Sequence, residues 1–168
     1  MVIRPSKLEE LPLLLTMVRQ AVKHMEDQGI HQWDEIYPNK EVLAGDLQEG
    51  TVHVAEISGE IGGFIVLNEI QSPEYQNVCW RNQGRILVVH RLTIAPIYQR
   101  RGLASFLMGF AENKAASEGF DGIRLDSFIE NRPACRLYEK RGYRPAGIVH
   151  LRKGEFYCFE KAISETEA

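Results

Sequence analysis

The sequence predicts an α/β fold in a single domain, with a central mixed sheet of about seven strands and helices on both faces. Segments with strand-like and helix-like patterns alternate along the 168 residues. The run from Arg85 to Ile94 is apolar on both alternating faces, which is typical of a strand inside a covered sheet. With 44% hydrophobic residues, the chain can form one core. We expect the domain to span residues 1–163, followed by a frayed tail at 164–168.

Composition excludes several classes of protein. The net charge of −3 argues against a nucleic-acid partner, and no apolar run reaches the roughly 18 residues that a membrane span needs. The N-terminal MVIRPSKLEE lacks a signal-peptide core, so we expect no export. The three cysteines form no CxxC pair, which fits reduced thiols in the cytoplasm.

The first elements are a short strand at residues 2–4 and an amphipathic helix. Ser6 and Glu9 have the spacing of a capping box, in which each side chain bonds a backbone amide of the other residue. Pro12 would remove a hydrogen bond from the interior of a helix that starts at Ser6, so we expect an off-register first turn or a start nearer Leu8. The helix ends at Gly29, and its apolar stripe is Leu11, Leu14, Leu15, Val18, Val22 and Met25.

The remaining elements follow from the same periodicities and from turn residues. Residues 58–60 link a hairpin, residues 71–84 form a long excursion, and Asn131 and Gly142 bracket a helix. The helix after Gly102 has a predicted apolar stripe of Leu103, Phe106, Leu107, Phe110, Ala111 and Ala115. The predicted helices are 39–48, 103–119 and 131–142, and the predicted strands are 52–57, 61–69, 85–94, 123–128, 144–151 and 155–162.

The turn between the central strand and the following helix is the main candidate site. Gly102 and Ala104 are small enough for a ligand to approach the backbone, and Arg100 and Arg101 add positive charge. Amides at a helix N-terminus bind anions such as phosphate. The alternative of equal weight is a basic surface turn that merely begins a helix. No GxxxxGK[ST], GxGxxG, HExxH, CxxC or GxSxG motif is present at a suitable place, so no nucleotide, zinc or serine-hydrolase site and no metal are predicted.

Two motifs resemble the GNAT N-acyltransferase superfamily. Gln99-x-x-Gly102-x-Ala104, after a strand that ends Leu92-Thr93-Ile94, resembles its acyl-CoA motif. The later run NRPACRLYEKRGY, residues 131–143, resembles its second signature, about thirty residues further on. Ala104 replaces the commoner glycine, and Tyr143 replaces phenylalanine. The predicted order of elements also matches this family across nearly the whole chain.

The resemblance implies acetyl-CoA as co-substrate. The pantetheine arm would pair with backbone groups of the strand, and Asn131 would bond the same arm, unless it serves only as the helix N-cap. Tyr138 would be the general acid that protonates the leaving thiolate, unless it only packs on the core. The strand residues implied are Leu92, Thr93 and Ile94, and the pyrophosphate-binding turn comprises Gln99, Arg100, Arg101, Gly102, Leu103, Ala104 and Ser105.

The general base and the acceptor pocket are less defined by the sequence. His90 shares an alternating face with Leu92, and an ordinary histidine pKa of about 6.5 suits a base. Glu69, Asp126 and water are alternatives, as is a core role for His90. Trp33 and Tyr37 would line the acceptor pocket or anchor their loop. Arg81, Arg85 and Arg91 are expected to be solvated or paired.

The function expected from these residues is transfer of an acetyl group from acetyl-CoA to a primary amine of a small molecule or of a protein or peptide. The alternatives are an acyl-CoA-binding sensor without catalysis and an interaction domain in which the basic turn has no role. The sequence does not encode the acceptor's identity, and it leaves a homodimer open.

Overall fold

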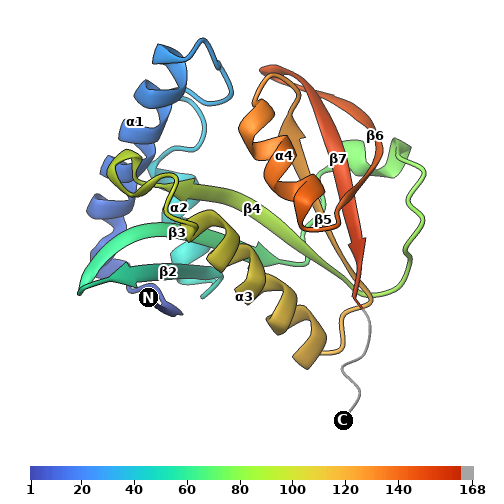
Figure 1. Cartoon of the computed structure of the whole chain (residues 1–168), viewed down its shortest axis with the longest axis horizontal. Helices are drawn as coiled ribbons and strands as arrows, with labels where there is room; N and C mark the ends of the chain where they lie inside the picture. Colours follow the sequence, from blue (N-terminus) through green and yellow to red (C-terminus); the bar gives the residue numbers. More distant parts are fainter. Residues whose placement is uncertain (164–168) are drawn as a thin grey trace. The chain divides into compact units, whose positions relative to one another are not determined.

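The computed structural model describes residues 1–163, so the predicted tail at 164–168 lies outside the described residues. The order of helices and strands is the predicted one, and three short 3-10 helices are added, of which η2 lies in the predicted excursion (Figure 1). The elements are β1 Val2–Pro5, η1 Leu8–Glu10, α1 Leu11–Asp27, α2 Lys40–Gln48, β2 Val52–Ile57, β3 Glu60–Asn68, η2 Pro73–Asn77, β4 Ile86–Ile94, η3 Pro96–Tyr98, α3 Leu103–Ser117, β5 Gly122–Phe128, α4 Arg132–Lys140, β6 Arg144–Leu151 and β7 Gly154–Ala162.

The seven strands form a mixed sheet in the order β1-β2-β3-β4-β5-β7-β6. β4 and β5 are parallel, whereas the pairs β1–β2, β2–β3, β5–β7 and β6–β7 are antiparallel. The predicted α/β fold with a mixed seven-stranded sheet is therefore confirmed. The chain divides into two compact units: the first comprises Met1–Leu67 and His90–Phe110, and the second comprises Asn68–Val89 and the chain from Ala111 onward. The three unit boundaries fall at the end of β3, inside β4 and inside α3.

In the first unit, α1 and α2 cover one face of β2 and β3. Alternate residues of β2 point to this face, as the period of a strand requires. The apolar stripe of α1 packs there because it gathers long aliphatic side chains on one side of the helix. The buried cluster consists of Leu14, Met17, Val18, Leu43, Leu47, Val52, Val54, Phe64, Val66 and Ala95.

The opposite face of the same strands receives the beginning of α3. The His53 ring lies 4.8 Å from the Phe110 ring. A Cβ built on Gly62 would lie 2.9 Å from Leu103 Cδ2. On Gly63 it would lie 2.7 Å from Ile94 Cδ1. The two glycines therefore let α3 and the end of β4 approach the strand more closely than any side chain would allow.

One prediction for α3 is wrong. The predicted buried stripe includes Phe106, which is 37% exposed, and omits Met108, which is completely buried. The helix start carries large apolar residues on almost every side, so periodicity cannot select the buried face.

The start of α1 resolves the difficulty with Pro12. A 3-10 turn occupies Leu8–Glu10, and α1 begins at Leu11 with Pro12 in its first turn. An amide is not needed there, because the first helical amides have no acceptor within the helix.

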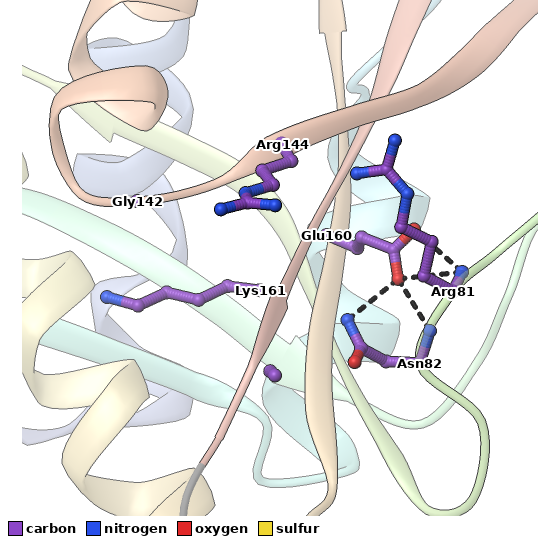
Figure 2. Close-up of a pocket in the computed structure, with 7 residues that line it drawn as sticks. Arg81, Asn82, Gly142, Arg144, Glu160 and Lys161 are labelled. Atoms are coloured by element: carbon purple, nitrogen blue, oxygen red, sulfur yellow. Dashed lines mark hydrogen bonds between the residues drawn. The ribbon is translucent and has the colours of Figure 1, made fainter.

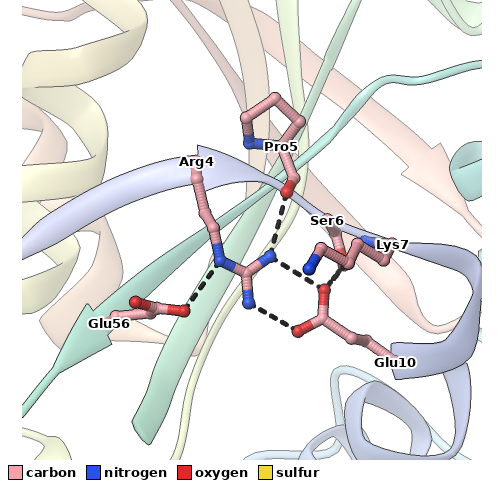
Figure 3. Close-up of polar contacts among 6 residues, drawn as sticks. All are labelled: Arg4, Pro5, Ser6, Lys7, Glu10 and Glu56. Carbon is pink, nitrogen blue, oxygen red and sulfur yellow. Dashed lines mark hydrogen bonds and ion pairs between the residues drawn. The ribbon is translucent and has the colours of Figure 1, made fainter. Parts of the chain in front are cut away.

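The predicted capping box between Ser6 and Glu9 is wrong by one residue, because Glu10 takes that role (Figure 3). The Lys7 amide donates to Glu10 Oε1 at 2.7 Å, and Ser6 Oγ donates to the same oxygen at 3.2 Å. Arg4 donates to both Glu10 oxygens at 2.9 and 2.7 Å and to Glu56 at 2.7 Å. The Arg4 hydrogen bonds lower the pKa of Glu10 to about 2. Glu10 takes the capping role in place of Glu9 because it also pairs with Arg4 on β1. The spacing of residues in the sequence cannot reveal this pairing.

In the second unit, β5 and β7 are covered on both faces. The Tyr138 ring of α4 lies 5.9 Å from the Phe159 ring on one face. On the other, Tyr75 Oη donates to Asp126 Oδ2 at 2.6 Å. The excursion at 71–84 is thus an ordered cover for this sheet. No helix within residues 1–163 combines the length and apolar character needed to cross a bilayer.

Candidate functional site

Strand β4 contains a residue in the left-handed conformation. Arg91 has φ +51°, a conformation that costs a side-chain-bearing residue about 1–3 kcal/mol and persists only where the surroundings impose it. A left-handed residue interrupts the pleat. The two-residue alternation that placed His90 and Leu92 on one face therefore does not extend across Arg91. Thr93 Oγ1 donates to the Arg91 carbonyl at 2.9 Å.

The Arg91 side chain is paired inside the first unit, as expected. Its Nε and Nη2 donate to Asp46 Oδ2 and Oδ1 at 2.7 Å each, and its Nη1 donates to Tyr37 Oη at 2.8 Å. The Arg91 and Asp46 side chains are only 10% and 11% exposed. Burial by itself would lower the pKa of Arg91, but Tyr37 and Asp46 outweigh it and raise the pKa. This is a water-excluded, bidentate pair of the strong kind.

The turn before α3 has the geometry of an anion-binding nest. Arg100 has φ +63° and Gly102 has φ +79°, on either side of Arg101. Such changes in the sign of φ direct successive backbone amides toward one side. Phe106 N donates to the Gly102 carbonyl at 2.9 Å, so Leu103 and Ala104 belong to the first turn, whose amides have no acceptor within the helix.

The side chains around this turn are held within the first unit. The Arg101 guanidinium lies 5.7 Å from the centroid of the Tyr98 ring. Tyr98 Oη in turn donates to Glu60 at 2.5 Å. Gln99 Nε2 lies 3.5 Å from the Ile94 carbonyl, a weak contact at the limit of hydrogen-bond length. The exposed Arg100, Arg101 and Gly102 leave the backbone accessible to a phosphate-sized anion, so the residues present fit the pyrophosphate of coenzyme A.

The acceptor candidates Trp33 and Tyr37 lie in the segment before α2. Trp33 is half-buried, and Tyr37 is 37% exposed. Asp34 Oδ1 accepts from the Tyr37 amide at 3.3 Å, and Asp34 N donates to the Tyr37 carbonyl at 3.1 Å. The segment is therefore a closed turn, and the Tyr37 hydroxyl joins it to Arg91.

Asn131 belongs to the second unit and caps α4. Its Oδ1 accepts from Ala134 N at 3.3 Å, so the N-cap role foreseen as an alternative is confirmed. The cap uses the side-chain oxygen of Asn131. The cap therefore does not decide whether Asn131 binds a ligand.

Tyr138 is 7% exposed and packs between the rings of Phe159 and Tyr143, at 5.9 and 6.0 Å. Burial and then the charge of Asp126 raise its pKa above the usual value. Among residues 1–163, its hydroxyl has no hydrogen-bond partner. Tyr138 thus packs on the core and also carries a protonated hydroxyl that no group in the described part of the chain engages.

The other candidate bases have structural partners in the second unit. Asp126 accepts the Tyr75 hydroxyl. Glu69 pairs with Arg85 at 3.2 Å and is 54% exposed. Arg85 also donates to the Glu118 carbonyl at 2.8 Å, so the expectation that it is paired is confirmed. His90 lies in the first unit and is half-buried.

Asp46 and Gly63 are the residues that the sequence prediction missed. The glycine pair inside an apolar strand was a detectable signal of close backbone approach. Asp46 gave no signal, because its partner lies 45 residues away.

A pocket of about 330 Å³ lies elsewhere in the second unit (Figure 2). The Glu160 carboxylate there accepts from the amides of Arg81 and Asn82 and from the Asn82 side chain, at 2.8–3.1 Å. The lining residues include none of the predicted site residues. They are Arg81, Asn82, Gly142, Arg144, Glu160, Lys161 and Ala162.

Known proteins resemble this chain over most of its length. A curated relative, streptothricin acetyltransferase from Escherichia coli, is 29% identical over 129 residues, covering 74% of this chain and 67% of that protein. A GNAT-family acetyltransferase from Streptococcus agalactiae 2603 has a TM-score of 0.84 at 24% identity, covering 98% of this chain and 96% of that one. The PaiA N-acetyltransferase from Thermoplasma acidophilum, solved in complex with coenzyme A, has a TM-score of 0.74 at 20% identity, covering 96% and 98%. At these identities, the two solved structures support the fold alone.

A comparison with protein-family models shows the family of this chain. The model of the acetyltransferase (GNAT) family matches residues 18–143, which include both sequence motifs and the nest before α3. The chain therefore belongs to the GNAT family of acetyltransferases.

Proposed function

We propose that the protein transfers an acetyl group from acetyl-CoA to a primary amine of a small molecule. The nest formed by Arg100 and Gly102 at the start of α3 carries the proposal, because it offers backbone amides and a positive helix end to a pyrophosphate. Further support comes from membership in the acetyltransferase family and from a structural neighbour that binds coenzyme A. The relative named for streptothricin, rather than for a protein, favours a small-molecule acceptor.

The donor would be held by two stretches of the first unit. The Gln99–Ser105 turn would bind the pyrophosphate through its backbone amides other than that of Gln99, which donates to the Pro96 carbonyl at 3.2 Å. Leu92, Thr93 and Ile94 would present backbone groups to the pantetheine arm, as an added strand does at a sheet edge. Asn131, which caps α4, would also bind coenzyme A.

The chemistry requires two proton movements. Acetyl-CoA supplies the acetyl group as a thioester. A neutral amine attacks the carbonyl, the new C–N bond forms as the C–S bond breaks, the nitrogen loses a proton and the departing sulfur gains one. His90, or water, would accept the proton from nitrogen.

Tyr138 would donate the proton to sulfur. Its raised pKa keeps the phenol protonated at neutral pH, and its hydroxyl has no partner within residues 1–163. Solvent would then restore the proton to the phenolate. A general acid must carry its proton before the reaction, and Tyr138 meets that condition.

The acceptor would bind near Trp33 and Tyr37. Residues 23–49 carry seven carboxylates and two lysines, and of these carboxylates Asp46 is already paired with Arg91. Such an excess of negative charge attracts a cationic amine and raises its local concentration. The single-domain organisation, the cytoplasmic location and any homodimer stay predictions.

The deciding experiment measures thiol release from acetyl-CoA with a panel of small-molecule amines and peptides. Replacing Tyr138 with Phe should lower kcat by about 10²-fold or more, while leaving coenzyme A affinity by titration calorimetry nearly unchanged. Tyr157→Phe, at a half-buried tyrosine on β7, is the matched control and should keep full activity. Binding of coenzyme A without thiol release from any amine would favour the sensor alternative.

A second variant tests the turn. Arg101→Glu combined with Gly102→Asp places two carboxylates beside the nest and imposes a side chain where φ is +79°. Coenzyme A binding should be abolished. Unchanged affinity would exclude this turn as the pyrophosphate site.

A further inference from the structure

We infer that Arg91 is a positioning residue that fixes the acceptor segment, residues 34–38, against the strand that holds the donor. It acts through its bonds to Asp46 and Tyr37 rather than by contact with the reacting atoms. The inference rests on the proposed function and adds to it a determinant of acceptor binding.

Three separate parts of the first unit meet at the Arg91 guanidinium. Arg91 belongs to β4, Asp46 to α2, and Tyr37 to the segment before α2. Nε and Nη2 engage the carboxylate as a fork at 2.7 Å, and Nη1 engages the Tyr37 hydroxyl at 2.8 Å. Arginine alone among the side chains offers donors in this rigid planar arrangement, so one side chain ties all three parts together.

The pairing also stabilises the unusual backbone of β4. The left-handed φ of Arg91, +51°, needs surroundings that impose it. Asp46 holds the side chain, and Thr93 Oγ1 holds the carbonyl at 2.9 Å. The Thr93 bond does not involve the Arg91 side chain, so it stays in place when that side chain is replaced.

The acceptor segment has internal bonds that make it move as one piece. Asp34 bonds the Tyr37 backbone in both directions. Asn39 Nδ2 donates to the Ile36 carbonyl at 3.0 Å, while its Oδ1 caps α2. The bond from Arg91 to Tyr37 therefore orients the whole turn and not one side chain.

The hydroxyl of Tyr37 would also select the acceptor. It accepts a hydrogen bond from Arg91, and within residues 1–163 its own hydrogen has no acceptor. Since Tyr37 is 37% exposed, that hydrogen can be donated to a substrate. The acceptor expected is a small amine with an oxygen atom placed to receive this bond.

The experiment measures steady-state constants for both substrates in the wild type and in Arg91→Met, Asp46→Asn and Tyr37→Phe. Each substitution should raise the acceptor's KM by about tenfold, the size of one lost charge-assisted hydrogen bond, and change the KM of acetyl-CoA less than twofold. Arg85→Met is the matched control, because it removes another paired arginine outside this network. It should leave the acceptor's KM unchanged.

Two further measurements separate positioning from general damage. The double variant Asp46→Asn with Arg91→Met should be less impaired than the product of the single effects, because it leaves no unpaired buried charge. Hydrogen exchange at residues 34–38 should accelerate in Arg91→Met and not in Arg85→Met. Tyr37→Phe keeps the ring and the Arg91–Asp46 pair, so it remains informative if the charge variants do not fold.

The outcomes distinguish this inference from the proposed function. An active wild type with equal effects on both KM values, or with unchanged exchange at 34–38 in Arg91→Met, would overturn the positioning role alone. A wild type that binds coenzyme A but acetylates no amine would overturn the proposed function, and the acceptor role with it.

Discussion

Replacing Gly63 with alanine tests the close approach on which the proposed donor site depends. The new Cβ would lie 2.7 Å from Ile94 Cδ1 and 2.8 Å from the Thr93 carbonyl oxygen. Carbon atoms pack best at about 3.5–4.0 Å. The Ile94 side chain can rotate, but the Thr93 oxygen belongs to the backbone of β4. Part of the strand itself must therefore move.

The expected cost follows from two opposing effects. Overpacking of a core typically costs about 1–3 kcal/mol, and replacing a strand glycine recovers about 0.5–1 kcal/mol of chain entropy. The free energy of unfolding should thus fall by about 1–2 kcal/mol. For a chain of this size, that corresponds to about 2–4 °C in Tm for each kcal/mol.

The assay is urea unfolding, together with coenzyme A titration by calorimetry. Gly45→Ala is the control, because a Cβ on this α2 residue meets no atom within 4 Å, and alanine should stabilise the helix by about 1 kcal/mol. Coenzyme A affinity should fall in Gly63→Ala, since Thr93 and Leu103 border the proposed donor site. A Gly63→Ala protein as stable as the wild type, with unchanged affinity, would refute the reasoning.

Three further predictions concern stability and reactivity. Arg4 lowers the pKa of Glu10 from 4.5 to about 2. The stabilisation from this carboxylate should therefore be complete above about pH 4.5 and lost as the pH falls through about 2. In an acid titration of Glu10→Gln, the free energy of unfolding should not show this loss. Asn131→Ala should lower the free energy of unfolding by about 1 kcal/mol through loss of the α4 cap, with Asn131→Asp retaining most of it; equal losses in both would argue against capping. Only Cys79 of the three cysteines is exposed, and burial raises the pKa of Cys158 to about 12. A thiol reagent should therefore modify Cys79 alone rapidly in the native protein. Rapid modification of two cysteines would contradict the burial of Cys135 and Cys158.

Local patterns were sufficient for most of the fold. Periodicity, the Asn131 cap and the terminal glycines located the helices and strands to within a few residues, because each signal depends on neighbours in the chain. The two motifs also identified the family, and the Gln99–Ser105 turn could be read as an anion site from its small and basic residues. Failures occurred where a helix was apolar on many sides, as in α3, or where two acidic residues competed for a cap, as at Glu9 and Glu10.

The sequence by itself therefore determined the order of elements, the family and the candidate donor turn. The tertiary structure alone decided which acidic residue Arg4 selects, that Arg91 adopts a left-handed conformation inside β4, and that Asp46 and Tyr37 bind it. The bonds of Arg91 to Asp46 and Tyr37 join residues 45 and 54 positions apart, and no local propensity encodes such a distance. Residues far apart in the sequence form ion pairs and hydrogen bonds only where packing brings them together. The partners of the proposed acceptor segment could therefore be identified only in the folded chain.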